Sequence, residues 1–413
     1  MPTLTPVPQA LIPVDTAAAQ AISAQNYDEF QSDREVWDIL QAQPNSLLKV
    51  TMPHCHVDDL ANAPAEGGPE ALAHAREQMQ ALIDDSLTRT VSNLLWVYEI
   101  TSPKRPEAPQ LGIGGCGSTA EIRTEETPGG TIIRNEGIRP DKAQGRADLL
   151  EAITADTGFV NLAVQDQQGL LLAELTQVAQ SRPADLEAVD EDGNRHRVWL
   201  LTDAAQQQKF VKLIAAEPAA YVADGNHRSA AAAQLGKAHF LSVFFPTSRL
   251  GLEPYNRLLP LNGLAAADFL QKLESNFEVA ELEGVETFRP AAVHEFGLYL
   301  ARKWYRLTPR EGSYNPADAA ESIDADIIQR HIIDGILGMS DARDKRINYV
   351  GGNKDAAYLK SRVDAGAYDL ALSLAPVTMA QFVAVCEQNK FMPPKSTWFD
   401  PKIRTGLVIS LLS

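Results

Sequence analysis

The chain has 413 residues, of which 45% are hydrophobic and 22% are charged, and its formal net charge is −17 at pH 7. This length predicts two or three domains with ample core, and the composition is ordinary for a globular protein. An acidic surface repels nucleic acid except at a local basic patch, so we expect no nucleic-acid partner.

The cysteines and the apolar stretches of the sequence indicate in which cellular compartment the protein is expected. The three cysteines lie far apart in the sequence, which argues against a disulfide framework and favours reduced thiols in the cytoplasm. No Lys or Arg precedes Arg34, and no compact apolar stretch indicates a secretory signal. The longest uncharged apolar stretch, 370–386, contains Pro376 and several polar residues. It predicts a strand and an amphipathic helix rather than a membrane span.

The first elements are predicted in chain order as follows. Residues 1–25 are rich in Pro, Ala and Thr and predict an irregular lead-in. A helix over 33–41 and a strand over 47–52 come next. Apolar side chains at a 3.6-residue spacing predict a long helix over 70–90. A strand over 93–101 and its hairpin partner over 111–122 follow.

The remaining elements alternate helices with short strands and show no steady βαβ rhythm. Strands are expected at 130–135, 158–164, 197–202, 220–223, 239–246, 298–307, 346–350, 369–374 and 406–412. Helices are expected at 141–155, 170–180, 204–217, 229–236, 265–276 and 324–338. We therefore predict an α+β fold with two domains, 1–260 and 261–413.

The segment 223–228, Ala-Asp-Gly-Asn-His-Arg, joins a short apolar strand to an alanine-rich helix. The first N–H groups of a helix have no intrahelical partner and carry the positive end of the helix dipole. Together with the Arg228 fork they could hold a phosphate, while Gly225 allows close approach and Asp224 is placed to cap the helix. A plain Asp-Gly turn with a capped helix and a solvated His-Arg pair fits the same residues.

Two further segments concentrate charge. In 134–146, Arg134, Arg139, Lys142 and Arg146 surround Glu136, and a carboxylate among cations stays ionised and can serve as a base. A solvated helix start with Arg/Asp pairs is the alternative. The proline-stiffened loop 392–402 carries two Lys, two hydroxyls and two aromatics, which suits an anionic ligand. The alternative is a packed surface loop.

Two weaker patterns are set aside. Residues 112–117 match G-x-G-x-x-G, but 118–124 predicts a strand where a Rossmann fold needs a helix. The run 54–59, His-Cys-His-Val-Asp-Asp, could ligate a metal, but adjacent residues rarely all point at one ion. We therefore expect no protein metal site.

Three stretches together resemble domain-of-unknown-function family 1015: 223–228, 136–146, and 392–402 with 406–409. The family's Asp-Gly-His-His-Arg core is similar to that of free serine kinases. The resemblance thereby implies a ParB/sulfiredoxin-like nucleotide-binding core with an additional α+β C-terminal region. The chain departs from the family at Asn226, Asn135 and Asn256, where the family usually has His. Asparagine can hydrogen-bond but cannot carry a proton.

The resemblance implies a small-molecule kinase that phosphorylates free L-serine or a similar hydroxyl compound from ADP or ATP with Mg²⁺. The catalytic residues would be Glu136 as base, His227 and Asp224. The phosphate-binding residues would be Gly225, Asn226, Arg228, Ser229, Arg139, Lys142, Arg146, Arg257, Lys395, Ser396, Thr397 and Lys402. A non-catalytic nucleotide- or phosphometabolite-binding regulator is the alternative. A homo-oligomer is left open, and no membrane partner is expected.

Overall fold

The computed structural model describes residues 1–27, 29–30, 32–342 and 344–412. Its contacts divide the chain into two compact units. Unit 1 comprises residues 1–134, 138–250 and 401–413, and unit 2 comprises 135–137 and 251–400. The predicted domain boundary at residue 260 stays a prediction. The α+β class is confirmed, because each unit combines a sheet with helices.

Unit 1 is built on a mixed sheet of 11 strands within the described residues. Its main path runs β4-β9-β6-β10-β3-β2-β1-β19-β5, and β7 and β8 attach to it through β2. The strand bounds are β1 Val7–Pro13, β2 Thr88–Thr101, β3 Gln110–Ser118, β4 Ile132–Arg134, β5 Ala155–Asp156, β6 Val160–Val164, β7 Leu186–Val189, β8 Arg195–Leu201, β9 Ala220–Asp224, β10 His239–Pro246 and β19 Ile409–Leu411. The long strand β2 pairs with β1 through its first half and with β3 and β8 through its second half.

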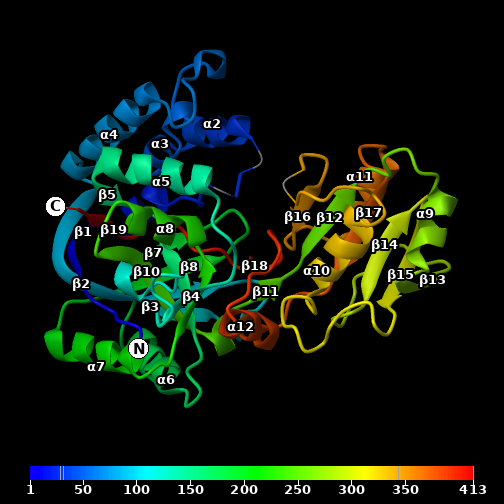
Figure 1. Cartoon of the computed structure of the whole chain (residues 1–413). Helices are drawn as coiled ribbons and strands as arrows, with labels where there is room; N and C mark the ends of the chain where they lie inside the picture. The colour runs from blue at the N-terminus through cyan, green and yellow to red at the C-terminus, as the bar shows by residue number, and fades with distance from the viewer. Residues whose placement is uncertain (28, 31, 343, 413) are drawn as a thin grey trace. The chain divides into compact units, whose positions relative to one another are not determined.

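Helices cover both faces of this sheet. Their bounds are α1 Thr16–Ile22, α2 Asp33–Ala42, α3 Leu48–Thr51, α4 Pro69–Asp84, α5 Pro140–Ile153, α6 Leu170–Ser181, α7 Ala204–Ala215 and α8 Asn226–Gln234. Leu175 of α6 and Phe210 of α7 are fully buried against apolar strand residues. Figure 1 shows α6 and α7 on the opposite side of the sheet from α4 and α5. Short 3₁₀ helices connect these elements: η1 Pro53–Cys55, η2 Leu60–Asn62, η3 Thr119–Glu121 and η4 Thr247–Arg249.

Unit 2 contains a six-stranded sheet in the order β13-β15-β14-β17-β12-β16 and a two-stranded sheet, β11-β18. The bounds are β11 Leu252–Glu253, β12 Tyr255–Leu259, α9 Ala266–Leu273, β13 Phe277–Glu281, β14 Phe296–Leu300, β15 Lys303–Pro309, α10 Asp324–Ile328, the π-helix η5 Gln329–Asp334, β16 Asn348–Gly351, α11 Ala356–Asp364, β17 Leu370–Leu374, α12 Met379–Glu387 and β18 Trp398–Phe399. Leu298 and Tyr299 are consecutive residues of β14, so their side chains point to opposite faces, and each belongs to a separate apolar cluster. Both faces of the larger sheet are therefore covered.

Some predictions are wrong, and packing explains why. Residues 1–25 are not an irregular lead-in, because β1 lies inside the large sheet and α1 follows it. The predicted strand 47–52 contains the helix α3, whose sequence Leu-Lys-Val-Thr alternates apolar and polar residues as a strand does, although all four residues are buried in the helix. The predicted strand 298–307 is the hairpin β14–β15. Residues 119–121 form η3 rather than a strand, and the G-x-G-x-x-G run lies within β3, which agrees with the rejection of a Rossmann motif.

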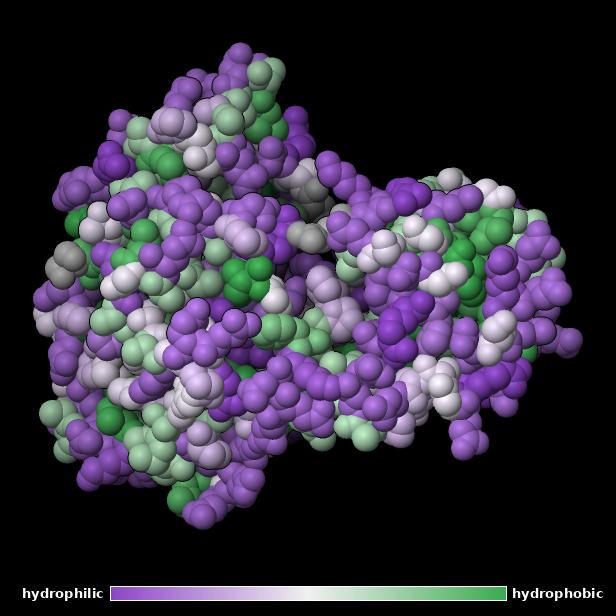
Figure 2. Space-filling view, in the orientation of Figure 1, coloured by the Kyte–Doolittle hydropathy of each residue, from purple (hydrophilic) through white to green (hydrophobic). Residues whose placement is uncertain are grey.

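The surface in view is mostly hydrophilic, with small hydrophobic patches (Figure 2). Among the described residues, no helix combines the length and the apolar character that crossing a membrane requires.

Candidate functional site

The turn between β9 and α8 in unit 1 holds the most prominent sequence motif. β9 ends at Asp224, Gly225 is the N-cap residue with φ +96°, and α8 begins at Asn226. A Cβ at position 225 would lie 3.1 Å from Val160 Cα and 3.2 Å from Arg228 Nε. The position therefore requires glycine both for its left-handed backbone and for its close packing.

Asp224 gathers two cations at the start of α8. Its Oδ1 accepts a hydrogen bond from Arg228 Nη2 at 3.1 Å, and its Oδ2 accepts one from Lys402 Nζ at 2.8 Å. The three side chains are only 10–21% exposed. The expectation that Asp224 caps the helix is wrong, because Gly225 is the N-cap residue and α8 has no side-chain cap hydrogen bond. Ion pairing with two partners holds the carboxylate instead.

His227 connects α8 with α5. The backbone N–H of Arg139 donates to Nε2 of His227 at 3.1 Å. Because Nε2 accepts this bond, a neutral His227 ring carries its proton on Nδ1. Arg139 is the N-cap residue of α5, so the N-termini of two helices meet at this contact. Both termini present backbone N–H groups and a positive dipole end, which together favour an anion.

The guanidinium of Arg228 is directed into unit 1. It donates to the carbonyl oxygen of Phe159 and, at 3.3 Å, to Oδ1 of Asn26, in addition to Asp224. Its side chain is 10% exposed. Arg228 therefore organises the turn and adds positive potential there, and direct phosphate contact by this residue stays a prediction.

Arg228 and Arg146 line a common small cavity of about 40 Å³. Asp156 lies in its wall, and burial raises the pKa of this carboxyl to about 6. Hydrogen bonds from the backbone N–H groups of Leu241, at 2.8 Å, and Gly158, at 3.3 Å, oppose that increase, as does the charge of Arg228. No sequence motif marks Asp156, because its neighbours come from distant segments.

Helix α5 presents the other predicted cations of unit 1. Lys142 and Arg146 line one cavity of about 200 Å³, as their four-residue spacing predicts. The Arg146 guanidinium also lies 3.5 Å from the ring centroid of Tyr27, a cation–π contact. The guanidinium of Arg139 pairs with Asp141 at 2.8 Å on the surface. The backbone of Arg139 contacts the first turn of α8 directly, through its hydrogen bond to His227.

Asn226 and Ser229 lie in the first turns of α8 and are both buried. The Ser229 hydroxyl donates to the backbone carbonyl oxygen of Asn226 at 3.0 Å, a contact internal to the helix. A ligand contact by the Ser229 hydroxyl stays a prediction.

Glu136 packs with unit 2, together with Asn135 and Gly137. The carbonyl oxygen of Asn135 accepts a hydrogen bond from the N–H of Met392 at 2.9 Å, which ties this segment to the loop 392–402. Burial raises the pKa of Tyr349, and the negative charge of Glu136 adds to that increase. Glu136 therefore lies within electrostatic reach of Tyr349.

Arg257 is the centre of the unit 2 cluster. It is 2% exposed, and its guanidinium donates to the carbonyl oxygens of Tyr255 at 2.7 Å and Lys395 at 3.0 Å. It stacks on the ring of Tyr349 at 4.3 Å. Burial lowers its pKa to about 10, which leaves it charged at neutral pH. A buried arginine thus fixes the loop that carries Lys395.

In the loop 392–402, the side chain of Lys395 is exposed, whereas the hydroxyl-bearing residues Ser396 and Thr397 are less exposed. Lys395 is exposed, has φ +58°, and its Nζ lies 3.3 Å from the Tyr255 hydroxyl. The buried Ser396 hydroxyl donates to the carbonyl oxygen of Pro393 at 2.6 Å, and Thr397 is half-buried. The structure therefore brings Glu136, Arg257 and Lys395 into one unit, and Asp224, His227, Arg228, Arg139 and Lys402 into the other.

Comparison with known proteins identifies a family. The family model DUF1015, described as a protein of unknown function, matches residues 5–330. No curated protein matches the chain.

Solved structures give remote likenesses. A free serine kinase in complex with AMP is 12% identical with a TM-score of 0.37, covering 65% of this chain and 83% of that one. A conserved hypothetical protein from Pyrococcus furiosus is 13% identical with a TM-score of 0.36, covering 66% and 89%. SbnI with a C-terminal truncation, from Staphylococcus aureus, is 9% identical with a TM-score of 0.36, covering 65% and 79%.

Proposed function

We propose that this chain, which belongs to the DUF1015 family, is a small-molecule kinase that transfers a phosphoryl group from a nucleotide to free L-serine or a similar hydroxyl compound. In this proposal unit 1 contains a ParB/sulfiredoxin-like nucleotide-binding core. The resemblance of three sequence segments to the family gives the proposal its substrate class, and the geometry of unit 1 supports a phosphate site there.

The observation that carries the proposal is the meeting of two helix N-termini at the His227–Arg139 hydrogen bond. Each terminus offers backbone N–H donors and a positive dipole end. Lys402 and Arg228 add two positive charges beside the turn, and both side chains pair with Asp224. Phosphoryl transfer asks a protein mainly for positioning and for neutralising charge, and this arrangement supplies both.

Glu136 is the proposed base. The substrate hydroxyl oxygen forms a bond to the transferred phosphorus, the bond from that phosphorus to the nucleotide breaks, and the hydroxyl proton passes to the Glu136 carboxylate. The nucleotide leaves with one phosphate fewer, and its new negative charge is met by the helix N-termini. Arg139 lies three positions after Glu136 in the sequence, and three residues of extended chain span about 10 Å. Chain connectivity therefore keeps Glu136 within about that distance of Arg139.

Mg²⁺ would accompany the nucleotide, because it usually keeps several waters and binds through phosphates with one or two carboxylates. Asp224 does not offer a ready ligand, since both of its oxygens bind cationic side chains. These residues therefore do not fit a preformed Mg²⁺ site, and no step of the proposal depends on one.

The test is incubation of the purified protein with L-serine, Mg²⁺ and either ADP or ATP, followed by mass spectrometry for O-phosphoserine. We expect product with one donor, and we expect Glu136→Gln to abolish it while nucleotide binding persists. Glu278→Gln, at an exposed position in β13, is the matched control and should keep activity. Absence of product with both donors, in protein that binds nucleotide, would refute the kinase.

A nucleotide-responsive regulator without turnover is the second candidate, and a specific observation favours it. Asn135, Asn226 and Asn256 are 2%, 7% and 4% exposed and replace histidines usual in the family. Asparagines cannot carry protons, which suits binding better than proton transfer. For a regulator, Glu136→Gln leaves nucleotide affinity unchanged and no product forms, while nucleotide changes the oligomeric state.

A further inference from the structure

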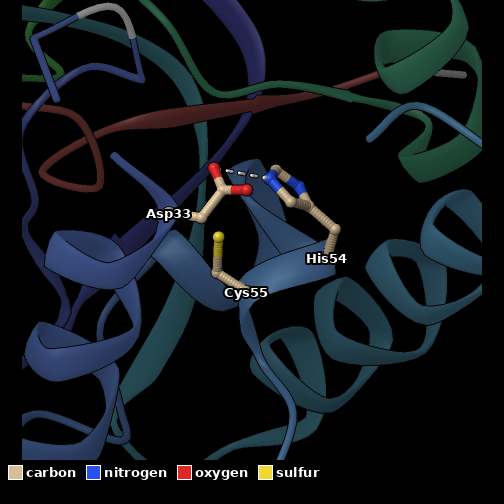
Figure 3. A group of neighbouring side chains, drawn as sticks. All are labelled: Asp33, His54 and Cys55. Carbon is tan, nitrogen blue, oxygen red and sulfur yellow. Dashed lines mark hydrogen bonds and ion pairs between the residues drawn. The ribbon is translucent and has the colours of Figure 1, made fainter. Parts of the chain in front are cut away.

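A mixed cluster of side chains lies in unit 1 outside the phosphate site. Asp33 is the first residue of α2, and His54 and Cys55 belong to η1. One ligand atom from each of the three lies within 4.8 Å of the other two. Figure 3 shows the three side chains directed toward one another, with Asp33 Oδ1 3.4 Å from His54 Nε2. Two elements of the chain thus converge on one point.

The local backbone explains how adjacent residues can share this point. Consecutive side chains of a 3₁₀ helix diverge by about 120°, which normally prevents neighbours from meeting at one atom. Here α2 packs against η1, and the Asp33 carboxylate lies within reach of both side chains. His54 and Cys55 are 3% and 0% exposed, so η1 holds them in place.

We propose that Asp33, His54 and Cys55 bind a transition-metal ion of the Zn²⁺ type. Thiolate, imidazole and carboxylate are the ligands that zinc uses in proteins, at about 2.0–2.3 Å. A tetrahedral ion with such bonds separates its ligand atoms by about 3.3–3.8 Å. The Asp33 side chain is 63% exposed and can rotate to close the remaining distance. The thiol sulfur selects against Mg²⁺ and Ca²⁺, which prefer oxygen ligands.

The surroundings supply a path of entry. Glu66 and His54 line the same cavity of about 200 Å³, and the Glu66 carboxylate acts electrostatically on Cys55. A water from this cavity can complete the coordination. On binding, the sulfur–metal bond forms and the thiol proton passes to solvent. The metal would link α2 to η1, and this proposal does not depend on the kinase.

The experiment uses the full chain, freed of metal with a chelator and then titrated with Co²⁺. We expect a thiolate-to-cobalt charge-transfer absorption and the visible bands of four-coordinate cobalt, saturating at about one ion per chain. Zn²⁺ should displace the cobalt and raise the melting temperature, because a ligand that binds only the native state stabilises it.

Variants identify the ligands. Cys55→Ser should lose the charge-transfer band, whereas Cys386→Ser, which changes another buried cysteine, should keep it. Asp33→Asn should weaken Co²⁺ binding about tenfold or more, in line with the loss of a metal contact. His74→Gln alters the nearby pair in which His56 Nδ1 lies 2.8 Å from His74 Nε2, and it should leave the spectrum unchanged.

If Cys55→Ser fails to fold, Asp33→Asn decides the matter. Its side chain is exposed, and Ser32 still caps α2 through the N–H of Glu35. The proposal is overturned if folded wild-type protein shows no charge-transfer band, if the band persists in Cys55→Ser, or if Asp33→Asn binds Co²⁺ as tightly as wild type.

Discussion

At the scale of single residues, the ion pairs of Asp224 should couple more strongly than exposed pairs do. Asp224 and Lys402 are 21% and 17% exposed, so water screens their attraction less than it does at the surface. A double-mutant cycle with Asp224→Asn and Lys402→Met should give a coupling energy of about 1–2 kcal/mol in urea unfolding. The pair Arg34–Asp38, at 68% and 54% exposure, should give about 0.5 kcal/mol or less. Equal couplings for the two pairs would contradict this reading.

Asp156 should make the stability of unit 1 depend on pH. Burial raises its pKa from 3.8 to about 6, so the folded state holds this proton more tightly than the unfolded state does. The free energy of unfolding therefore falls as the pH rises from about 4 to 6, and it loses about 1–3 kcal/mol there. Asp156→Asn should abolish that decrease, which urea unfolding at several pH values would measure. An unchanged slope in the variant would show that other groups cause it.

Residue types and local spacing predicted the helix α8, although it begins at Asn226 rather than at the predicted residue 229, and they predicted that Lys142 and Arg146 share a face. They did not predict the partners of Asp224, because Lys402 lies 178 positions further along the chain. Asp156 was missed for the same reason. Long-range contacts that determine a pKa have no signature in a single sequence.

At the scale of the elements, the β9–α8 turn depends on the backbone of Gly225. Gly225→Ala combines a positive φ with contacts of 3.1 and 3.2 Å, so it should destabilise the protein by about 2 kcal/mol or more. Gly145→Ala in α5 meets nothing within 4 Å and should instead stabilise by up to about 1 kcal/mol. Thermal unfolding of both variants makes the comparison, and equal effects would disprove the special role of the turn.

Most elements could be predicted because their apolar periodicity is strong, as in α4, or because they are short apolar runs between turn signals, as in β9 and β10. The failures have physical causes. Prolines at positions 6, 8 and 13 obscured β1, whose burial is provided by β2 and β19. The four residues of α3 alternate apolar and polar side chains, which is the pattern of a strand and is too short to show a helical period.

At the scale of the whole molecule, the chain leaves unit 1 after Leu250 and returns to it at Pro401. The returning segment contains strand β19, which pairs with both β1 and β5. A fragment of residues 251–400 should therefore unfold cooperatively, because it keeps its two apolar clusters. A fragment of residues 1–250 should be less stable than the same fragment joined to 401–413 by a Gly/Ser linker. Calorimetry would measure the melting temperature of each fragment. Equal melting temperatures for residues 1–250 with and without the joined segment 401–413 would refute the contribution of β19.

Sequence patterns predicted the strand near 406–412 but not its neighbours in the sheet. β1 and β19 are separated by nearly 400 residues. Their pairing depends on which strand edges remain unpaired once the other strands of the sheet have formed, and no local sequence pattern encodes this. The assignment of Glu136 to unit 2 and of Arg139 to unit 1 is likewise a property of tertiary packing.

The position of β19 has a consequence for synthesis on the ribosome. All of residues 251–400 emerge before the strand that joins β1 to β5. Until then the nascent chain carries two open strand edges, which are templates for unwanted pairing. Unit 2 can fold during that interval. The sheet of unit 1 cannot be completed until residues 401–413, which follow unit 2 in the sequence, have been translated. Conditions that slow translation through 251–400 should therefore favour chaperone capture of the N-terminal part.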